Sequence, residues 1–195
     1  ASAQELRDMG VKHPELHITA DPVFNLVPAG ADRGRDLLVK AGLPAGRKFA
    51  AVSVRDWPAA RQFPQQAARL CDHLHRTYGL ETVFLLMQPA ADRETTEQVR
   101  RAMESPSYLL DVPATPSELM AVLGQAELCV AMRLHTLIFA ARMAVPTVGL
   151  VYDPKVDSYL KELDLPSAGE VERFDVDRAC QVCDELMADY DRILA

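Results

Sequence analysis

Short apolar runs alternate with amphipathic stretches through most of the chain, from about residue 48 onward. Five runs have the length and the β-branched or aromatic content of buried strands: 49–54, 82–87, 108–112, 128–132 and 147–151. Apolar residues recur at helical spacing over 62–78, 92–103, 136–143, 156–163 and 175–194, and Thr115 caps a further helix that begins at Pro116. The alternation predicts βαβ units and a doubly wound, Rossmann-like parallel sheet with helices on both faces.

The segment that precedes this alternation has a different pattern. Residues 16–20 resemble an edge strand, and residues 27–34 are rich in small side chains, as a linker is. The chain starts inside a helical pattern, with Leu6 and Met9 on one face, which fits equally the last helix of a longer protein and a trimmed tag junction. We expect three parts: 1–27 as the tail of an absent N-terminal domain, 28–47 as an interdomain linker and helix, and 48–195 as the Rossmann-like domain.

Composition and charge narrow the classes of function. The 195 residues carry a formal net charge of -7, which argues against a nucleic-acid partner, so any anion site must be local. No apolar run approaches the roughly 20 residues of a transmembrane helix, and no signal peptide is evident. Four scattered cysteines fit a reducing cytoplasm, and the C-x-x-C of Cys180 and Cys183 lies in a helical pattern that indicates a structural role.

Charged side chains follow three of the predicted strands. If the strand order is 3-2-1-4-5, the first and fourth strands are neighbours at the point where the order reverses, and ligands bind beyond their carboxyl ends. Arg55 follows the first strand, Arg133 and His135 follow the fourth, and Asp153 and Lys155 follow the fifth. Three cations and a histidine then meet two helix N-termini at one edge, which predicts a site for a small, multiply charged anion.

Simpler interpretations of these residues stay open. A single arginine after a strand is often only a solvated surface charge. An anion site is favoured because three cations and a histidine are all predicted at the same edge of the sheet. Asp153 fits a helix cap as well as a ligand contact. Asp92 fits an acceptor contact or a cap, and Trp57 fits a sugar platform or loop packing. The sequence has no G-x-G-x-x-G, no Walker A motif and no cluster that demands a metal.

The run MRLHTLIFAARMAVPTVGLVYDPKVDSYL resembles the signature of polysaccharide pyruvyl transferases of the CsaB type, and TADPVFNL, VSVRDW and FLLMQPAADRE match in order. The resemblance implies the C-terminal half of a two-domain, GT-B-like enzyme. It implies transfer of a pyruvyl group from phosphoenolpyruvate, the donor substrate, to two hydroxyls of a cell-wall or surface saccharide, with release of phosphate and no cofactor. The resemblance does not say whether the acceptor is lipid-linked. It implies a cytoplasmic protein, either free in the cytoplasm or bound at the inner face of the membrane.

The resemblance also assigns roles. It places Arg133, Leu134 and His135 at the phosphoenolpyruvate site, with Arg55 beside them and Lys155 of Y-D-P-K as a further phosphate ligand. We expect His135 to act as the general acid, kept charged by the bound dianion, while the acceptor-side base lies in the absent half.

Two other functions compete with this one. A nucleotide-sugar glycosyltransferase or epimerase of the same architecture would need an acidic residue for the ribose, and Glu162 and Asp164 fit a helix surface better. An isolated, non-catalytic anion-binding domain is the third hypothesis.

Overall fold

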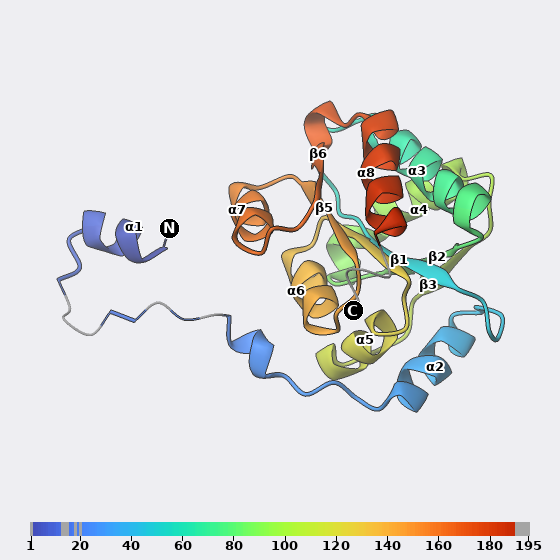
Figure 1. Ribbon diagram of the computed structural model, residues 1–195, viewed down its shortest axis with the longest axis horizontal. Helices are drawn as coiled ribbons and strands as arrows, with labels where there is room; N and C mark the ends of the chain where they lie inside the picture. Colours follow the sequence, from blue (N-terminus) through green and yellow to red (C-terminus); the bar gives the residue numbers. More distant parts are fainter. Residues whose placement is uncertain (1, 13–15, 18, 20, 190–195) are drawn as a thin grey trace.

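The computed structural model describes residues 2–12, 16–17, 19 and 21–189. Its centre is a six-stranded, all-parallel sheet in the order β3-β2-β1-β4-β5-β6, with helices on both faces (Figure 1). The strands are β1 (Phe49–Ser53), β2 (Glu81–Leu85), β3 (Ser107–Leu110), β4 (Leu128–Ala131), β5 (Thr147–Val151) and β6 (Ser167–Glu170). The predicted fold class is therefore confirmed, and so is the expected adjacency of β1 and β4 at the reversal of strand order.

Helices follow the strands as the apolar spacing predicts. They are α3 (Phe63–Tyr78), α4 (Pro89–Ala102), α5 (Pro116–Leu123), α6 (Leu134–Arg142), α7 (Pro154–Glu162) and α8 (Val176–Ala188). Thr115 caps α5 as predicted, in a capping box with Glu118. The predicted start of α4 at Asp92 is wrong, because the helix begins at Pro89 and holds Asp92 in its first turn. The final helix was predicted over 175–194; α8 ends at Ala188, and residues 190–194 of that prediction lie outside the described residues.

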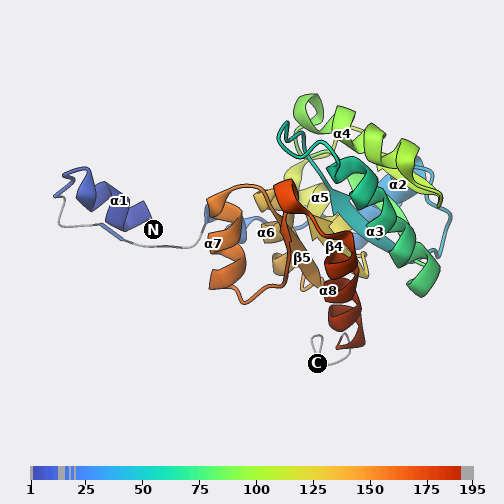
Figure 2. The same cartoon turned by 90° about the horizontal axis from the view of Figure 1, so that it is seen from above.

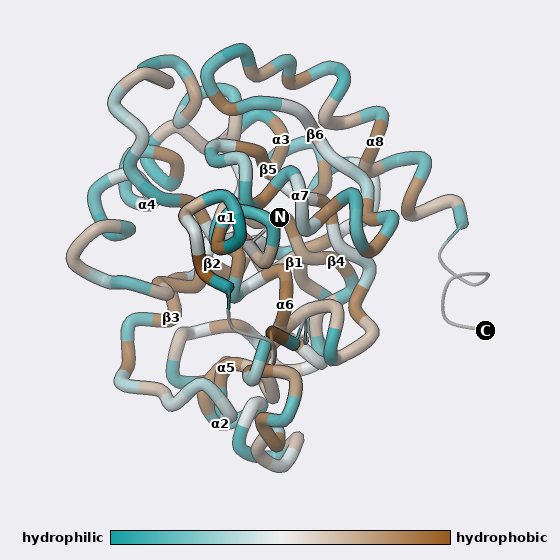
Figure 3. The backbone as a smooth tube through the Cα atoms, turned by 90° about the vertical axis from the view of Figure 1, so that its left-hand side faces the viewer, coloured by the Kyte–Doolittle hydropathy of each residue, from teal (hydrophilic) through white to brown (hydrophobic). Residues whose placement is uncertain are grey.

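The sheet separates two hydrophobic cores. Alternate residues of β1 belong to different cores: Ala50 and Val52 pack with α3, α4 and α8, whereas Phe49 and Ala51 pack with α5, α6 and α7. Figures 1 and 2 show the helices in these two layers, and in Figure 3 the hydrophobic stretches gather in the sheet and α6. Burial on both faces explains why the strands appear in the sequence as continuous apolar runs.

The sixth strand has no counterpart among the predicted elements. Its sequence is SAGE, and only Ala168 of the four residues is buried. It lies at the edge of the sheet beside β5, where one neighbour suffices to hold a strand without apolar content.

Ahead of the sheet, α1 (Ser2–Asp8) lies apart from the layers, and the 3-10 helix η1 (Pro22–Asn25) leads to α2 (Ala31–Lys40) (Figure 1). The edge strand predicted at 16–20 is not seen at residues 16, 17 and 19, and residues 18 and 20 lie outside the described residues. Helix α2 packs on α5, and its Leu37 and Leu38 join the core. The approach is close: a Cβ on Gly34 would lie 2.4 Å from the carbonyl oxygen of Ala121.

Candidate active site

The carboxyl ends of the strands open into a cavity of about 960 Å³. Arg55, Arg133, Leu134, His135 and Lys155, which the sequence analysis selected, all line it. They meet because β1, β4 and β5 are neighbours in the sheet, so the residues that leave these strands share one edge. Asp153 is the N-cap of α7, the helix whose first turn holds Lys155, and it does not line the cavity.

Arg133 is held by a buried ion pair. Its Nε donates to Oδ1 of Asp92 at 3.0 Å, and its Nη2 donates to the same oxygen. The other carboxylate oxygen of Asp92 accepts a hydrogen bond of 2.8 Å from the backbone N–H of Gln88. Asp92 is fully buried and the Arg133 side chain is 14% exposed. The pair fixes the guanidinium at the cavity wall and leaves Nη1 without a hydrogen-bond partner in the part of the chain that the structure describes.

Arg55 lies on a small aromatic cluster. Its guanidinium carbon is 4.9 Å from the ring centroid of Tyr152, and its Nη1 donates to the Tyr152 hydroxyl at 3.4 Å. Trp57 packs edge-on against Tyr152 with 5.3 Å between ring centroids, and its indole N–H donates to Glu172 at 2.8 Å. Among the described residues, no carboxylate forms an ion pair with Arg55. Its charge is therefore oriented by ring faces and remains available to an anion.

The third cation, Lys155, is the most exposed of the three. Lys155 is 59% exposed, and its Nζ is 3.9 Å from Oδ2 of Asp153, beyond hydrogen-bond distance. The other oxygen of Asp153 accepts from the backbone N–H of Lys155 at 2.9 Å and caps α7. The cap role of Asp153, one of the two interpretations from the sequence, is thus present in the structure.

His135 lies in the first turn of α6 and lines the cavity. Its side chain is exposed, and its ring centroid is 6.3 Å from that of Phe139. Leu134, half-buried beside it, contributes an apolar wall. Helix α6 begins without a side-chain cap, since Arg133 occupies the N-cap position and makes no capping hydrogen bond. Unsatisfied N–H groups and an exposed imidazole therefore face the same space as the arginines.

The contacts of three side chains at the cavity could not be read from the sequence. Asp92 was weighed there only as an acceptor contact or a cap, because its partner Arg133 lies 41 residues away. Tyr152 was part of the Y-D-P-K motif, and nothing local indicated that it supports Arg55. Asp111, which also lines the cavity, resembled an ordinary turn residue after β3.

The cysteines lie away from this site and remain thiols. All four are free, and burial raises the pKa of Cys183 to about 12 and that of Cys180 to about 11. The C-x-x-C pair lies inside α8 and not at a helix start after a strand, in agreement with a structural role. Within the described ranges, no group of three His, Cys, Asp or Glu side chains is placed to hold a metal ion. None of the described helices is both long and apolar enough to cross a membrane.

Fold and site together define a class: a parallel α/β domain with a cationic cavity beyond the carboxyl ends of its central strands. The family model "Polysaccharide pyruvyl transferase" matches residues 2–154, and the chain belongs to that family. No curated protein matches the sequence.

Among solved structures, seven chains match. One is the crystal structure of the glycosyl transferase family 9 from Veillonella parvula DSM 2008, 13% identical with a TM-score of 0.60. The match covers 89% of this chain and 54% of that chain, so this chain spans about half the length of the solved structure. At this identity the likeness concerns the fold alone.

Proposed function

We propose that this chain is the donor-binding half of an enzyme that transfers a pyruvyl group from phosphoenolpyruvate to two hydroxyls of a polysaccharide sugar. The observation that carries the proposal is the meeting of Arg55, Arg133 and Lys155 with the exposed His135 in one cavity of an otherwise acidic protein. Phosphoenolpyruvate has a carboxylate and a phosphate, and a fork of guanidinium donors fits each group. Membership of the pyruvyl transferase family supports the same reaction.

The chemistry needs one proton donor and a stabilised leaving group. A proton adds to the methylene carbon of the donor, and positive charge develops at the adjacent carbon that carries the phosphate. A first sugar hydroxyl attacks this carbon and a second hydroxyl displaces phosphate, which leaves the cyclic ketal. The two hydroxyls lose two protons: one replaces the proton given to the methylene group and the other leaves on the phosphate.

Each side chain has a role that its surroundings support. His135, exposed and free to approach the methylene carbon, is the general acid. Arg55 and Arg133, oriented by Tyr152 and Asp92, clamp the donor, and Lys155 neutralises phosphate charge as it leaves. Leu134 excludes water beside the reacting carbon. Asp153 acts on the donor only by capping α7, the helix that carries Lys155.

The donor is a substrate, and the mechanism calls on no cofactor. We place the chain as the C-terminal half of a two-domain, GT-B-like enzyme, because it spans about half of its structural neighbour, with residues 1–27 as the tail of the other half. The acceptor is a cell-wall or surface saccharide, free or lipid-linked, and the reaction takes place in the cytoplasm or at the inner membrane face. Membership of the pyruvyl transferase family supports this part of the proposal.

The test is phosphate release from phosphoenolpyruvate by the full-length protein with its saccharide acceptor. We expect His135→Asn to lower kcat by about 10²–10⁴-fold, the range of general acid catalysis, while the KM for phosphoenolpyruvate changes little. Near-normal turnover in this variant would remove His135 from the acid role. Transfer of a sugar from a nucleotide sugar, with no phosphate released from phosphoenolpyruvate, would instead establish the glycosyltransferase hypothesis.

A further inference from the structure

The cavity is larger than the phosphoenolpyruvate molecule that we propose to bind at its cationic end. Its volume of about 960 Å³ matches sites for drug-sized ligands, whereas the proposed donor is a three-carbon phosphate. The cations leave β1, β4 and β5, and the remaining wall comes from the ends of β2 and β3, from η1 and from the start of α5. In the order β3-β2-β1-β4, the end of β3 lies three strand spacings, roughly 14 Å, from that of β4. A donor bound by the cations therefore leaves the β3 end unoccupied.

The β3 end carries a fixed carboxylate, Asp111. It is the only acidic side chain that lines the cavity among the described residues. Arg93 of α4 donates from Nη1 and Nη2 to the two oxygens of Asp111, at 2.6 Å each. The two parallel hydrogen bonds from the Arg93 guanidinium fix the plane of the carboxylate, yet the Asp111 side chain remains 50% exposed. Each oxygen thus keeps a lone pair that a ligand can reach.

The charge of this pair limits the chemistry of its ligand. Arg93 neutralises Asp111, so the pair does not select a cation. The hydrogen bonds from Arg93 lower the pKa of the Asp111 carboxyl, which therefore accepts hydrogen bonds and is a poor base. The apolar side chains of Val112, Pro113 and Leu119 line the cavity beside it. An ionised acceptor next to an apolar wall suits a neutral ligand with hydroxyl groups and a C–H face, which is the chemistry of a saccharide.

We propose that Asp111 and this wall form the subsite for the acceptor saccharide, with Asp111 accepting hydrogen bonds from its hydroxyl groups. The inference rests on the proposed function, and it puts the orientation of the acceptor on this half of the enzyme. Asp111 is a specificity-determining residue, because Arg93 fixes its carboxylate while the oxygens stay exposed to the cavity, where they accept from a hydroxyl. The competing explanation is that the Arg93–Asp111 pair only ties α4 to the end of β3.

The experiment is a ¹⁵N NMR titration of the chain, saturated with phosphoenolpyruvate, with the methyl glycosides of glucose, galactose, mannose and N-acetylglucosamine. We expect at least one glycoside to shift the amides of Asp111, Val112 and Ala114. Asp111→Asn keeps the shape but loses the charge, and we expect it to weaken glycoside binding by at least about tenfold. The shifts that phosphoenolpyruvate causes at Leu134 and His135 stay as in the wild type.

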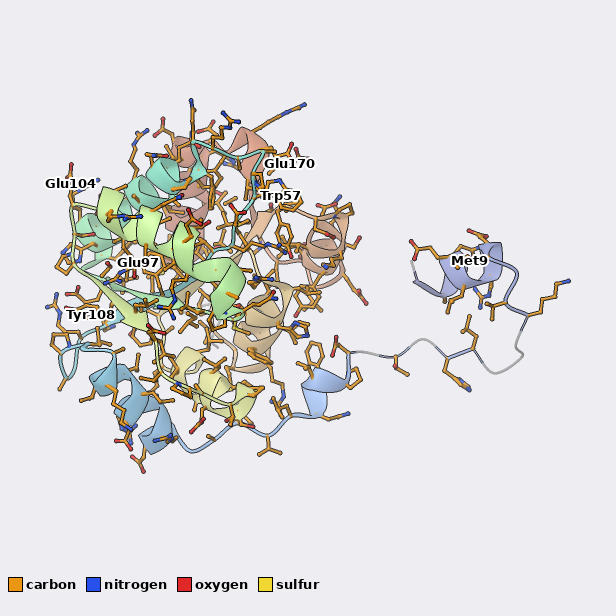
Figure 4. The ribbon with its side chains drawn as sticks, turned by 180° about the vertical axis from the view of Figure 1, so that it is seen from behind. Met9, Trp57, Glu97, Glu104, Tyr108 and Glu170 are labelled. Atoms are coloured by element: carbon orange, nitrogen blue, oxygen red, sulfur yellow. The ribbon has the colours of Figure 1, made fainter. Side chains whose placement is uncertain are left out.

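The matched control is Glu97→Gln on α4, labelled in Figure 4. The Glu97 carboxylate also accepts from an arginine, Arg100, at 2.8 Å, but it does not line the cavity. We expect this variant to bind the glycoside as the wild type does.

Any of four results overturns the inference. The first three are that no glycoside shifts the β3-end amides, that Asp111→Asn binds the glycoside as tightly as the wild type, and that Glu97→Gln loses as much affinity as Asp111→Asn. The fourth is loss of the phosphoenolpyruvate shifts in Asp111→Asn, since the effect is then not local to the subsite. If glycosides bind at the β3 end while phosphoenolpyruvate shifts no amide of the wild type, the donor proposal fails and the saccharide subsite stands.

Discussion

The carboxylate of Asp92 and the guanidinium of Arg133 form a buried ion pair that joins the first turn of α4 to the end of β4. The next residue on α4, Arg93, forms the opposite pair with Asp111 at the end of β3. One turn of helix thus orients both a cation at the donor end of the cavity and an anion at its far end. The pairs differ in burial, since Asp92 is fully buried and the Asp111 side chain is 50% exposed.

A double-mutant cycle on the buried pair should show strong coupling. Asp92→Asn and Arg133→Gln each leave one charge without its partner, and each should cost about 3 kcal/mol of unfolding free energy. The double variant should cost much less than the sum of the two. Urea denaturation measures all four free energies. In the control cycle, Glu97→Gln and Arg100→Gln, the coupling should stay below about 0.5 kcal/mol, as expected for a pair three residues apart on one half-buried helix face. Additive costs at Asp92 and Arg133 would contradict the buried-pair account.

Tyr152 should matter for donor binding through its ring. Tyr152→Leu removes the face over which the Arg55 guanidinium lies, and a lost cation–π contact should weaken phosphoenolpyruvate binding by roughly threefold. Tyr152→Phe keeps the face and should bind nearly as the wild type does. Isothermal titration calorimetry gives both Kd values. The interpretation of the aromatic cluster is wrong if the phenylalanine variant is as weak as the leucine variant.

The α5 capping box should make stability depend on pH under acid conditions. The Glu118 carboxylate accepts from the Thr115 backbone N–H at 2.7 Å and from Nε of Arg33 at 2.6 Å. The Thr115 backbone first, and then Arg33, lower the pKa of Glu118 from 4.5 to about 2. The unfolded chain binds this proton more readily, so the contribution of Glu118 is complete above pH 4.5 and is lost as the pH falls toward 2.

Glu118→Gln removes this dependence. The difference in unfolding free energy between wild type and variant should therefore be constant above pH 4.5 and shrink between pH 4.5 and 2, as followed by urea denaturation at each pH. A difference that stays constant down to pH 2 would show that the carboxyl is not stabilised in its charged form.

A side chain at Gly34 should destabilise the protein, because it would push α2 away from α5. A Cβ there would lie 2.3 Å from Nε2 of Gln125 and 2.4 Å from the backbone oxygen of Ala121, so α2 would have to move away from α5. Gly34→Ala should cost about 1–3 kcal/mol of unfolding free energy. At Gly30, the N-cap of α2, nothing lies within 4 Å of a Cβ, and Gly30→Ala should cost clearly less. Equal costs in the two variants would mean that the α2–α5 contact contributes little to stability.

The fold was largely predictable because strands buried on both faces appear as apolar runs of the right length. The end of each strand then placed Arg55, Arg133 and Lys155 on one edge without any knowledge of tertiary contacts. Strand β6 could not be predicted, since SAGE has no hydrophobic signal and depends on its pairing with β5. The partners of the cations also could not be predicted, because Asp92 pairs across 41 residues and Tyr152 reaches Arg55 across 97.

The most direct test of the central claim is a ¹⁵N NMR titration of this chain with phosphoenolpyruvate, beside a UDP-sugar, with Arg133→Ala as the control. The account predicts saturable shifts of the amides at Arg55, Leu134 and His135 with phosphoenolpyruvate alone, and their loss in the variant. Shifts caused only by the UDP-sugar, no shift with either compound, or shifts that persist in Arg133→Ala would contradict it.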